Sequence, residues 1–346
     1  MKIVYIEANP GNGGAEEYAV NLALEARDAG HDVCFVLGDA TGAMVEKVRE
    51  ANFDMLIIPM KSSFNLFKVL GSAWKLKRFI DDYKPDIIHA QMLREQSLVI
   101  LAKMLGAKTR LVRSFHRLDQ FNGKMRPLMW VYRRYTDAFI ATSEYVKGYL
   151  AENGLKKNVF VVHNGVPAVV VTAKKKGLGF LGRLAPEKGI KDFVLVNSKL
   201  FADEPLTIGG DGPDMNELGT VVSQKRLKTK LLGQISDKNA FFGLFNVLVL
   251  PSSTEALPLV VLEAFSIGTP VVAFDIPPLR GLIDGENGIL VKPGDYKLLA
   301  ETAVQLSGSK EYGIYSDNAR ATYLHGYTLE KMWFDTERLY DKIRAA

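Results

Sequence analysis

The sequence predicts an α/β protein built from two doubly wound domains, each a parallel sheet covered by helices. Short, nearly continuous apolar runs alternate with stretches of helical periodicity, and this alternation occurs in two separate series along the chain. Both features are typical of parallel strands that helices cover on both faces. A length of 346 residues suits two domains. The hydrophobic content of 47% excludes a disordered chain, and a lone cysteine, Cys34, excludes a disulfide scaffold.

In the first series, apolar runs without polar interruption predict strands that are buried on both faces of a sheet. The expected strands are 2–7, 32–37, 54–58, 86–90, 109–115, 137–142 and 159–163. The expected helices between them are 15–29, 41–51, 65–82, 95–105, 126–135 and 143–153. Strands and helices that alternate at this spacing specify a doubly wound domain.

The second series begins after a linker that we place at about 166–176, where turn residues and three lysines interrupt the pattern. Its expected strands are 178–181, 205–209, 229–233, 247–251, 270–274 and 288–291, with helices between them. Apolar residues in 329–344 recur at the spacing of an amphipathic helix. We expect domains at 1–165 and 166–325, with the C-terminal helix, about 326–346, packed back on the first domain.

The loops that follow strands are the expected ligand-binding segments, because such sheets bind ligands beyond the carboxyl ends of their strands. Two Rossmann-like domains of this kind are expected to face a central cleft. The first loop, 8–16, contains Gly13 and Gly14 just before a helix, where exposed amides favour an anion. Glu16 occupies the third glycine position of a dinucleotide fingerprint, which argues against NAD. A glycine turn that only connects two elements explains this loop equally well.

The loop after the first strand of the second domain, 182–189, carries two cations. Arg183 and Lys188 flank a turn at the carboxyl end of the strand, just before a helix. Two cations beside a helix terminus suit a diphosphate. Basic residues in a solvated turn are also common, so this loop alone does not decide its ligand.

Two glutamates follow the strand at 247–251. Glu255 lies at the strand-to-helix junction and Glu263 lies eight residues further on. Eight steps of roughly 100° along the helix place their side chains within about 80° of each other around its axis, so both can face one ligand. A carboxylate among Leu and Val needs partners, and sugar hydroxyls are suitable ones. The alternative is that Glu263 pairs with a cation or an amide cluster of the core.

Several further motifs accompany these loops along nearly the whole chain. They are Gly-His-Asp-Val at 30–33, Lys-Pro-Asp-Ile-Ile-His at 84–89, Asn-Gly-Val at 164–166, Gly-Gly-Asp-Gly-Pro at 209–213, Gly-Thr-Pro-Val-Val at 268–272 and Asn-Gly-Ile-Leu at 287–290. In this combination, the chain resembles the retaining, nucleotide-sugar-dependent glycosyltransferases of family 4 (group 1), which have the two-domain GT-B fold.

The resemblance implies donor-binding roles for these residues. Arg183 and Lys188 would hold the diphosphate in place of a metal ion, so neither a metal nor a cofactor is expected. Glu263 would accept hydrogen bonds from the ribose, and Glu255 from the transferred sugar. Further donor contacts would come from Gly13, Gly14 and Gly182, from the backbone at Gln234 and Ile235, and from the amides of Leu257, Leu259 and Val260. Where the family often has Gly-Phe-Gly after the first glutamate, Pro258 removes one possible amide contact.

His116 is the histidine that the resemblance places in the active site, facing the sugar, although a histidine at a strand end is often structural. His89 and His163 lie within predicted strands, and we expect them to be hydrogen-bonded core or rim residues. No cluster of His, Cys and Asp has the spacing of metal ligands.

The net charge of +5 arises from one basic segment. Residues 1–60 carry 4 basic and 10 acidic side chains, residues 61–134 carry 16 and 5, and the remainder is balanced. Aromatic residues such as Trp74 and Trp130 lie among these cations, and basic amphipathic helices of this kind bind anionic bilayers. A solvated basic face whose apolar side packs on the first sheet explains the pattern equally well. Nucleic acid is not expected, because no recognition motif accompanies the charge.

The expected function is transfer of a hexose or N-acetylhexosamine from a nucleotide diphosphate sugar, a UDP-sugar before GDP-mannose. The expected acceptor is a hydroxyl of a lipid-linked or cell-surface polysaccharide such as lipopolysaccharide. No apolar run is long enough to span a bilayer, and the first residues read as a strand, so we expect a cytoplasmic protein, peripheral on the inner face of the plasma membrane. Two alternatives stay open: a nucleotide-sugar-binding regulatory subunit without turnover, and a nucleotide-sugar epimerase.

Overall fold

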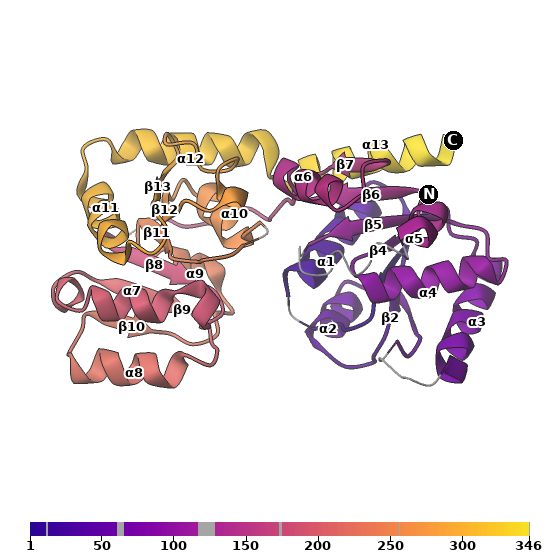
Figure 1. Cartoon of the computed structure of the whole chain (residues 1–346), viewed down its shortest axis with the longest axis horizontal. Coiled ribbons are helices and arrows are strands. Elements are labelled where there is room, and N and C mark those ends of the chain that lie inside the picture. The colour runs from indigo at the N-terminus through magenta and orange to yellow at the C-terminus, as the bar shows by residue number, and fades with distance from the viewer. Residues whose placement is uncertain (12, 61–65, 117–128, 173–174, 256, 346) are drawn as a thin grey trace. The chain divides into compact units, whose positions relative to one another are not determined.

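The computed structural model describes residues 1–11, 13–60, 66–116, 129–172, 175–255 and 257–345. The chain divides into two compact units. Residues 1–165 and 329–346 form the N-terminal unit, and residues 166–328 form the C-terminal unit. Each unit has its own parallel sheet covered by helices (Figure 1). The predicted class, two doubly wound Rossmann-like domains, is confirmed.

The N-terminal unit has a seven-stranded sheet in the order β3-β2-β1-β4-β5-β6-β7, and every neighbouring pair is parallel. The strand order reverses between β1 and β4, which is where open α/β sheets bind ligands. The strands are β1 (Lys2–Glu7), β2 (Asp32–Leu37), β3 (Asp54–Ile57), β4 (Ile87–Ala90), β5 (Arg110–Phe115), β6 (Ala138–Ala141) and β7 (Val159–Val161).

Helices cover both faces of this sheet because its strands are apolar on both sides. In β1, Ile3 and Tyr5 belong to one core cluster, whereas Val4 and Ile6 belong to another. Successive side chains of a strand point to opposite faces, so β1 contributes to both cores. The helices are α1 (Gly14–Asp28), α2 (Ala43–Glu50), α3 (Leu66–Tyr83), α4 (Leu93–Met104), α5 (Met129–Tyr135), α6 (Glu144–Glu152) and α13 (Leu329–Ala345).

The last helix, α13, returns from the C-terminal unit and packs on the N-terminal unit, where Figure 1 shows it in yellow. Trp333 and Tyr340 are buried in the core cluster that also contains much of α1. The loop that follows α1 also contacts α13, because Nε2 of His31 lies 2.8 Å from Oε1 of Glu337. These contacts make α13 part of the N-terminal core.

The C-terminal unit has a six-stranded parallel sheet in the order β10-β9-β8-β11-β12-β13. The strands are β8 (Leu178–Leu181), β9 (Leu206–Gly209), β10 (Thr229–Leu231), β11 (Val247–Leu250), β12 (Val271–Phe274) and β13 (Gly288–Val291). The helices are α7 (Ile190–Val196), α8 (Met215–Gln224), α9 (Lys238–Phe242), α10 (Leu259–Ser266), α11 (Tyr296–Gly308) and α12 (Tyr312–Gly326), with short 3₁₀ turns at Pro186–Lys188, Leu200–Ala202 and Pro277–Leu279. One large apolar cluster fills this unit.

The segment expected as a linker is fixed to the C-terminal unit over much of its length. Val166 forms a parallel bridge with Thr328. The amide of Val169 donates to Oγ of Ser266 at 3.0 Å, and Val169 is buried in the apolar core. Residues 173–174 lie outside the described chain. The described part therefore behaves as the edge of a domain rather than as a free connector.

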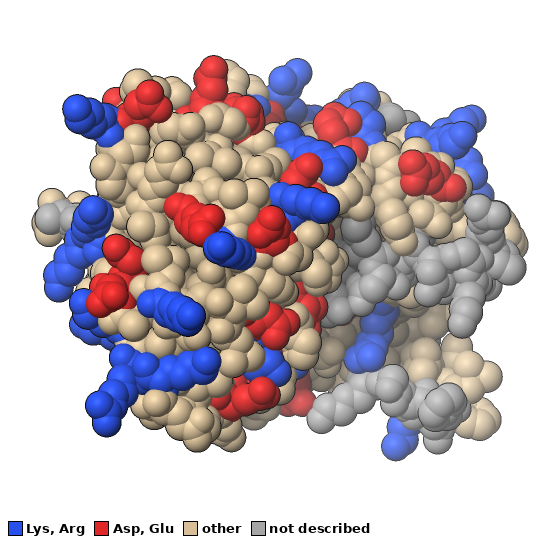
Figure 2. All heavy atoms as spheres, turned by 60° about the vertical axis from the view of Figure 1, so that its left-hand side comes forward, with Lys and Arg blue, Asp and Glu red and all other residues tan. Residues whose placement is uncertain are grey.

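The surface charge of the C-terminal half is mixed. Figure 2 brings the left-hand side of Figure 1 forward, and on this face Lys and Arg are interspersed with Asp and Glu. This distribution agrees with the 21 basic and 21 acidic residues of 166–346. Within the described residues, no helix is both long enough and apolar enough to cross a bilayer.

Candidate functional site

Two sequence-predicted residues of the C-terminal unit meet at the carboxyl ends of neighbouring strands. Lys188 follows β8 and Glu255 follows β11, and these two strands pair in the sheet. Nζ of Lys188 donates to Oε1 of Glu255 at 2.6 Å, and only 8% of the Glu255 side chain is exposed. The cation expected to bind phosphate therefore lies against the carboxylate expected to bind the sugar.

Backbone contacts hold these two loops together. The carbonyl of Glu187 accepts hydrogen bonds from the amide of Ser253 at 2.9 Å and from its Oγ at 3.1 Å. Gly189 has a φ of 66°, and a Cβ at this position would lie 2.3 Å from the carbonyl oxygen of Pro251. Only glycine allows the backbone at residue 189 to lie this close to Pro251. Gly189 therefore keeps the neighbouring Lys188 beside the loop that carries Glu255.

Glu263 is buried in α10 and is paired with a cation that the sequence analysis missed. Nζ of Lys238, at the start of α9, donates to Oε1 of Glu263 at 2.6 Å, and 5% of the Glu263 side chain is exposed. This contact corresponds to the structural alternative stated above, in which a core cation satisfies the carboxylate. Its proposed role in ribose binding stays a prediction.

The helical argument that related Glu255 to Glu263 is wrong. Helix α10 begins at Leu259 with Pro258 as its N-cap, so Glu255 lies before the helix and Glu263 is its fifth residue. Proline has no amide hydrogen and fixes its own φ, which favours the first positions of a helix over its interior. The loop at 251–255, rather than a shared helix face, positions Glu255.

The other predicted donor contacts of the C-terminal unit surround the same strand ends. Arg183 is exposed in the loop after β8, where the amide of Gly182 donates to the carbonyl of Gly209 at 3.2 Å. Leu259 and Val260 are the first residues of α10, and Leu257 packs on the core just before them. After β10, Gln234 is exposed, whereas Ile235 packs on the core. Donor contacts at these positions stay predictions.

In the N-terminal unit, His116 comes directly after β5 and is half-buried. Its Nε2 lies 2.9 Å from Oε1 of Gln91, and its ring packs edge-on against Tyr18 at 4.6 Å between centroids. Burial and the nearby Arg113 guanidinium lower the pKa of His116 to about 3. The imidazole is therefore neutral at physiological pH, which fits a hydrogen-bonding role toward a sugar rather than a charged one.

The glycine loop that begins α1 is tied to two buried carboxyl groups. The amide of Ala8 donates to Oε1 of Glu95 at 2.8 Å, and the amide of Asn9 donates to Oε1 of Glu7 at 3.2 Å. Both glutamates are at most 3% exposed. Burial, together with the neighbouring Glu95 carboxyl, raises the pKa of Glu7 to about 9, so Glu7 holds a proton at neutral pH.

This acid pair positions the loop that was predicted to approach the donor. Gly13 is the N-cap of α1 and Gly14 is its first residue, while residue 12 lies outside the described chain. Arg113, 1% exposed, donates from Nη1 to Oε1 of Gln96 at 3.0 Å and lies close enough to Glu95 to interact with its charge. The sequence analysis missed this cluster, because single acidic residues at a strand end or in a first helical turn look solvated.

Two further histidines of this unit, His89 and His163, are hydrogen-bonded, as expected. In the buried His89 ring, Nδ1 lies 2.7 Å from the Tyr340 hydroxyl and Nε2 lies 2.7 Å from Oγ of Ser114. Nδ1 of His163 lies 3.2 Å from the carbonyl of Thr142. Within the described residues, no group of three or more His, Cys, Asp or Glu side chains could hold a metal ion.

Comparison with known proteins identifies both units. Residues 12–169 match the family described as Glycosyltransferase Family 4, and residues 175–309 match Glycosyl transferases group 1. The fold is similar to that of Anabaena HepE in complex with UDP and glucose, with a TM-score of 0.84, 19% identity, and coverage of 99% of this chain and 100% of that one.

Two curated relatives are similar in sequence. An exopolysaccharide phosphotransferase of Streptomyces coelicolor is 29% identical over 61% of this chain, which spans 24% of that relative's length. UDP-Gal:alpha-D-GlcNAc-diphosphoundecaprenol alpha-1,3-galactosyltransferase of Escherichia coli is 24% identical over 94% of this chain and 89% of that protein. Since the two family matches span both Rossmann-like units, the chain is a glycosyltransferase of the GT-B fold and belongs to family 4, group 1.

Proposed function

We propose that this glycosyltransferase moves a hexose or an N-acetylhexosamine from a nucleotide diphosphate sugar, with retention of the anomeric configuration. A UDP-sugar is the favoured donor and GDP-mannose the next. The acceptor is a hydroxyl of a lipid-linked or cell-surface polysaccharide. The observation that carries the proposal is the 2.6 Å contact between Lys188 and Glu255. It sets the cation that we propose to bind phosphate beside the carboxylate that we propose to accept sugar hydroxyls.

Four residues would have separate roles in the proposed reaction. Lys188 and Arg183 would neutralise the charge that develops on the departing diphosphate, without a divalent metal. Glu255 would orient the transferred sugar through its hydroxyls, and neutral His116 would hydrogen-bond to the same sugar. The bond between C1 and the phosphate oxygen breaks while the acceptor oxygen bonds C1 from the same face. The acceptor proton passes to the leaving phosphate.

The comparisons support the choice of donor and acceptor class. The Escherichia coli relative is named for a UDP-Gal donor and a diphosphoundecaprenol-linked acceptor, and HepE has UDP and glucose bound. Both proteins are described with a uridine nucleotide and a sugar, and for this reason we rank UDP-sugars first. The lipid-linked acceptor is consistent with the basic segment of the N-terminal unit.

The experiment is a panel of UDP-, GDP- and ADP-sugars, assayed with and without an acceptor lipid extract. We expect transfer from one donor and loss of turnover in Arg183→Ala and Glu255→Gln, with Glu187→Gln as a matched control on an exposed side chain. NMR of the product anomer tests retention. Binding without transfer would indicate a regulatory subunit, a new monosaccharide without acceptor would indicate an epimerase, and an inverted anomer would overturn the proposed stereochemistry.

We further propose that the protein binds an anionic membrane surface peripherally through α3. Phe67, Leu70 and Trp74 recur at helical spacing and are 86%, 40% and 53% exposed, with Lys75 and Arg78 exposed beside them. The opposite face of α3 is buried through Ala73, Leu76 and Ile80. The helix therefore has one apolar face in the core and a second in solvent. Residues 61–65 and 117–128 of the basic segment lie outside the described chain.

The test of membrane binding is sedimentation with phosphatidylcholine vesicles that contain or lack phosphatidylglycerol. We expect binding to the anionic vesicles, and weaker binding of a Phe67→Ser/Trp74→Ser variant because it buries less apolar area. Equal sedimentation of variant and native protein would overturn the assignment to α3.

A further inference from the structure

A basic pocket lies at the edge of the N-terminal sheet opposite to the glycine loop and His116. Its volume is about 470 Å³. It is formed where β4, β5 and β6 begin, whereas the candidate site lies where these parallel strands end. Its lining residues are Asp86, Lys103, Ala107, Lys108, Thr109, Arg110, Arg134, Tyr135 and Asp137. Four of these side chains are cations and two are carboxylates.

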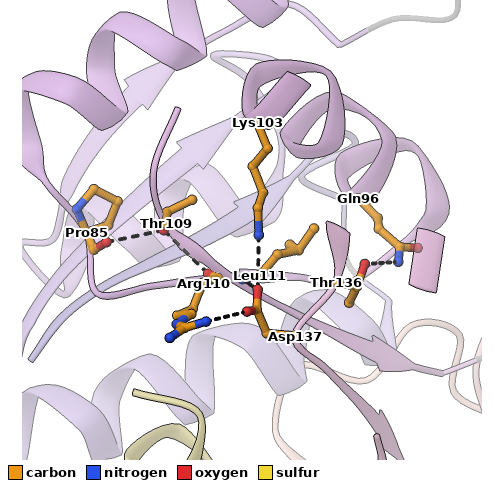
Figure 3. Close-up of polar contacts among 8 residues, drawn as sticks. All are labelled: Pro85, Gln96, Lys103, Thr109, Arg110, Leu111, Thr136 and Asp137. Carbon is orange, nitrogen blue, oxygen red and sulfur yellow. Dashed lines mark hydrogen bonds and ion pairs between the residues drawn. The ribbon is translucent and has the colours of Figure 1, made fainter. Parts of the chain in front are cut away.

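One of the two carboxylates is already saturated by cations of the lining. Asp137 accepts hydrogen bonds from Nζ of Lys103 and from Nη1 of Arg110, each at 3.0 Å (Figure 3). The amide of Leu111 donates a third hydrogen bond to Asp137, at 2.9 Å. Asp137 thus fixes Lys103 and Arg110 at the pocket and has little capacity left for other cations.

The other carboxylate is paired with groups from outside the lining. Asp86 accepts a hydrogen bond from the amide of Lys2 at 2.8 Å, and Nε of Arg344 lies 3.6 Å from it. Lys108 and Arg134 make no ion pair with any described residue, and both are exposed at the pocket. The guanidinium of Arg134 lies 5.7 Å from the ring centroid of Tyr135, another residue of the lining. The pocket therefore has two cations that no carboxylate of the described residues neutralises.

We propose that this pocket binds a phosphate ester, with Lys108 and Arg134 as the principal contacts. A phosphate group carries up to two negative charges, which matches the two uncompensated cations. Arg presents a planar fork of donors that suits phosphate oxygens, and Lys adds a compact charge. The volume of the pocket exceeds that of a simple ion and leaves room for the alcohol part of the ester.

The phosphate ester has two possible sources, a phospholipid headgroup and a soluble metabolite. Exposed apolar side chains neighbour the lining residues in the sequence: Met104 and Leu105 lie between Lys103 and Lys108, and Trp130 lies one helical turn before Arg134. The pocket also adjoins α3, because a Cβ on Gly106 would lie 3.9 Å from Cε of Lys77. A bilayer that contacts α3 could therefore present a headgroup here, and solvent could present a soluble ester.

The experiment compares the native protein with a Lys108→Ala/Arg134→Ala variant. The matched control is Lys47→Ala/Lys156→Ala, which removes the same charge from two exposed positions outside the pocket. Calorimetry with sn-glycerol 3-phosphate measures the soluble source, and sedimentation with phosphatidylglycerol vesicles measures the lipid source. We expect binding in at least one arm, weakened about tenfold or more in the pocket variant and unchanged in the control.

The two arms identify the source. Competition of vesicle binding by sn-glycerol 3-phosphate assigns the lipid headgroup, and binding of the soluble ester without vesicle binding assigns a metabolite. Equal loss in the pocket variant and in the control, chloride that competes as well as the phosphate ester, or no binding in either arm would overturn the proposal. Hydrolysis of the donor without acceptor, to which no residue of the pocket is proposed to contribute, should persist in the pocket variant, so failure here is distinguishable from failure of the proposed transfer reaction.

Discussion

Nζ of Lys188 donates a 2.6 Å hydrogen bond to Oε1 of Glu255, although 67 residues separate them in the sequence. The adjacent strands β8 and β11 bring these two residues together, so one contact joins the predicted phosphate site to the predicted sugar site. A bound donor would insert between or beside these charges. Under the proposed roles of Lys188 and Glu255, the pair would couple the binding of the two halves of the donor.

This coupling predicts the effect of Glu255→Gln. The amide keeps the shape of the side chain but removes the charge that orients Lys188, so we expect kcat/KM to fall by about a hundredfold or more, as for other electrostatic contacts at a reacting centre. Steady-state kinetics with the active nucleotide sugar measure the fall. A variant with native kcat/KM would show that Glu255 does not contact the transferred sugar.

The buried pair Lys238–Glu263 predicts a large stability effect from removing its cation. Lys238→Met leaves the carboxylate of Glu263, 5% exposed, without this partner, and we expect a loss of about 1–3 kcal/mol in the free energy of unfolding. Urea denaturation measures the loss. The matched control is Lys191→Met, whose partner Glu217 is 60% exposed and should contribute at most about 1 kcal/mol. Equal losses in the two variants would contradict the role of burial.

The raised pKa of Glu7 predicts that stability falls as the pH rises. The folded state holds the proton up to a pKa of about 9, whereas the unfolded chain releases it near 4.5. Between these values the folded state binds more protons, so the free energy of unfolding decreases with increasing pH. We expect Glu7→Gln to flatten this dependence in urea denaturation at a series of pH values.

A suitable control for the pH experiment is Glu50→Gln, because Glu50 is exposed at the end of α2. This variant should keep the native pH dependence. If Glu7→Gln also keeps it, the carboxyl of Glu7 is ionised in the folded protein at neutral pH.

The close approach of Gly189 to Pro251 predicts that Gly189→Ala is harmful. The added Cβ would lie 2.3 Å from the Pro251 carbonyl at a φ of 66°, so the loops must separate. We expect the free energy of unfolding, measured by thermal denaturation, to fall by about 1–3 kcal/mol. We also expect weaker donor binding, because Lys188 shifts with the loop. Gly281→Ala is the control, since a Cβ there meets no atom within 4 Å. A harmless Gly189→Ala would contradict the described loop contact.

The sequence predicts the strands well because most are short apolar runs whose residues are buried. The run at 2–7, for example, becomes β1 with the expected bounds, since Ile3 to Ile6 supply two opposite cores. The boundary of α10 was harder to predict. With Pro258 as its N-cap, the helix begins later than the apolar periodicity indicates. Glu255 therefore lies outside the helix and does not share a helix face with Glu263.

The residues that sequence analysis missed have partners far away in the chain. Lys238 is 25 residues from Glu263, and Glu7 acquires its proton only through burial near Glu95, 88 residues later. A local pattern contains no information about such pairs, because the sheet order brings the segments together. Motif spacing found Lys188 and Glu255 one at a time, but not their contact.

The return of α13 to the N-terminal unit has a consequence for how the chain is made. The C-terminal unit, 166–328, is continuous and can fold as soon as it leaves the ribosome. The N-terminal core is complete only when Trp333 and Tyr340 arrive, after that unit has been synthesised. The N-terminal unit, most of which precedes the C-terminal unit in the chain, is therefore completed after it. Until then, the buried His89 lacks its Tyr340 partner and the apolar face of α1 stays open.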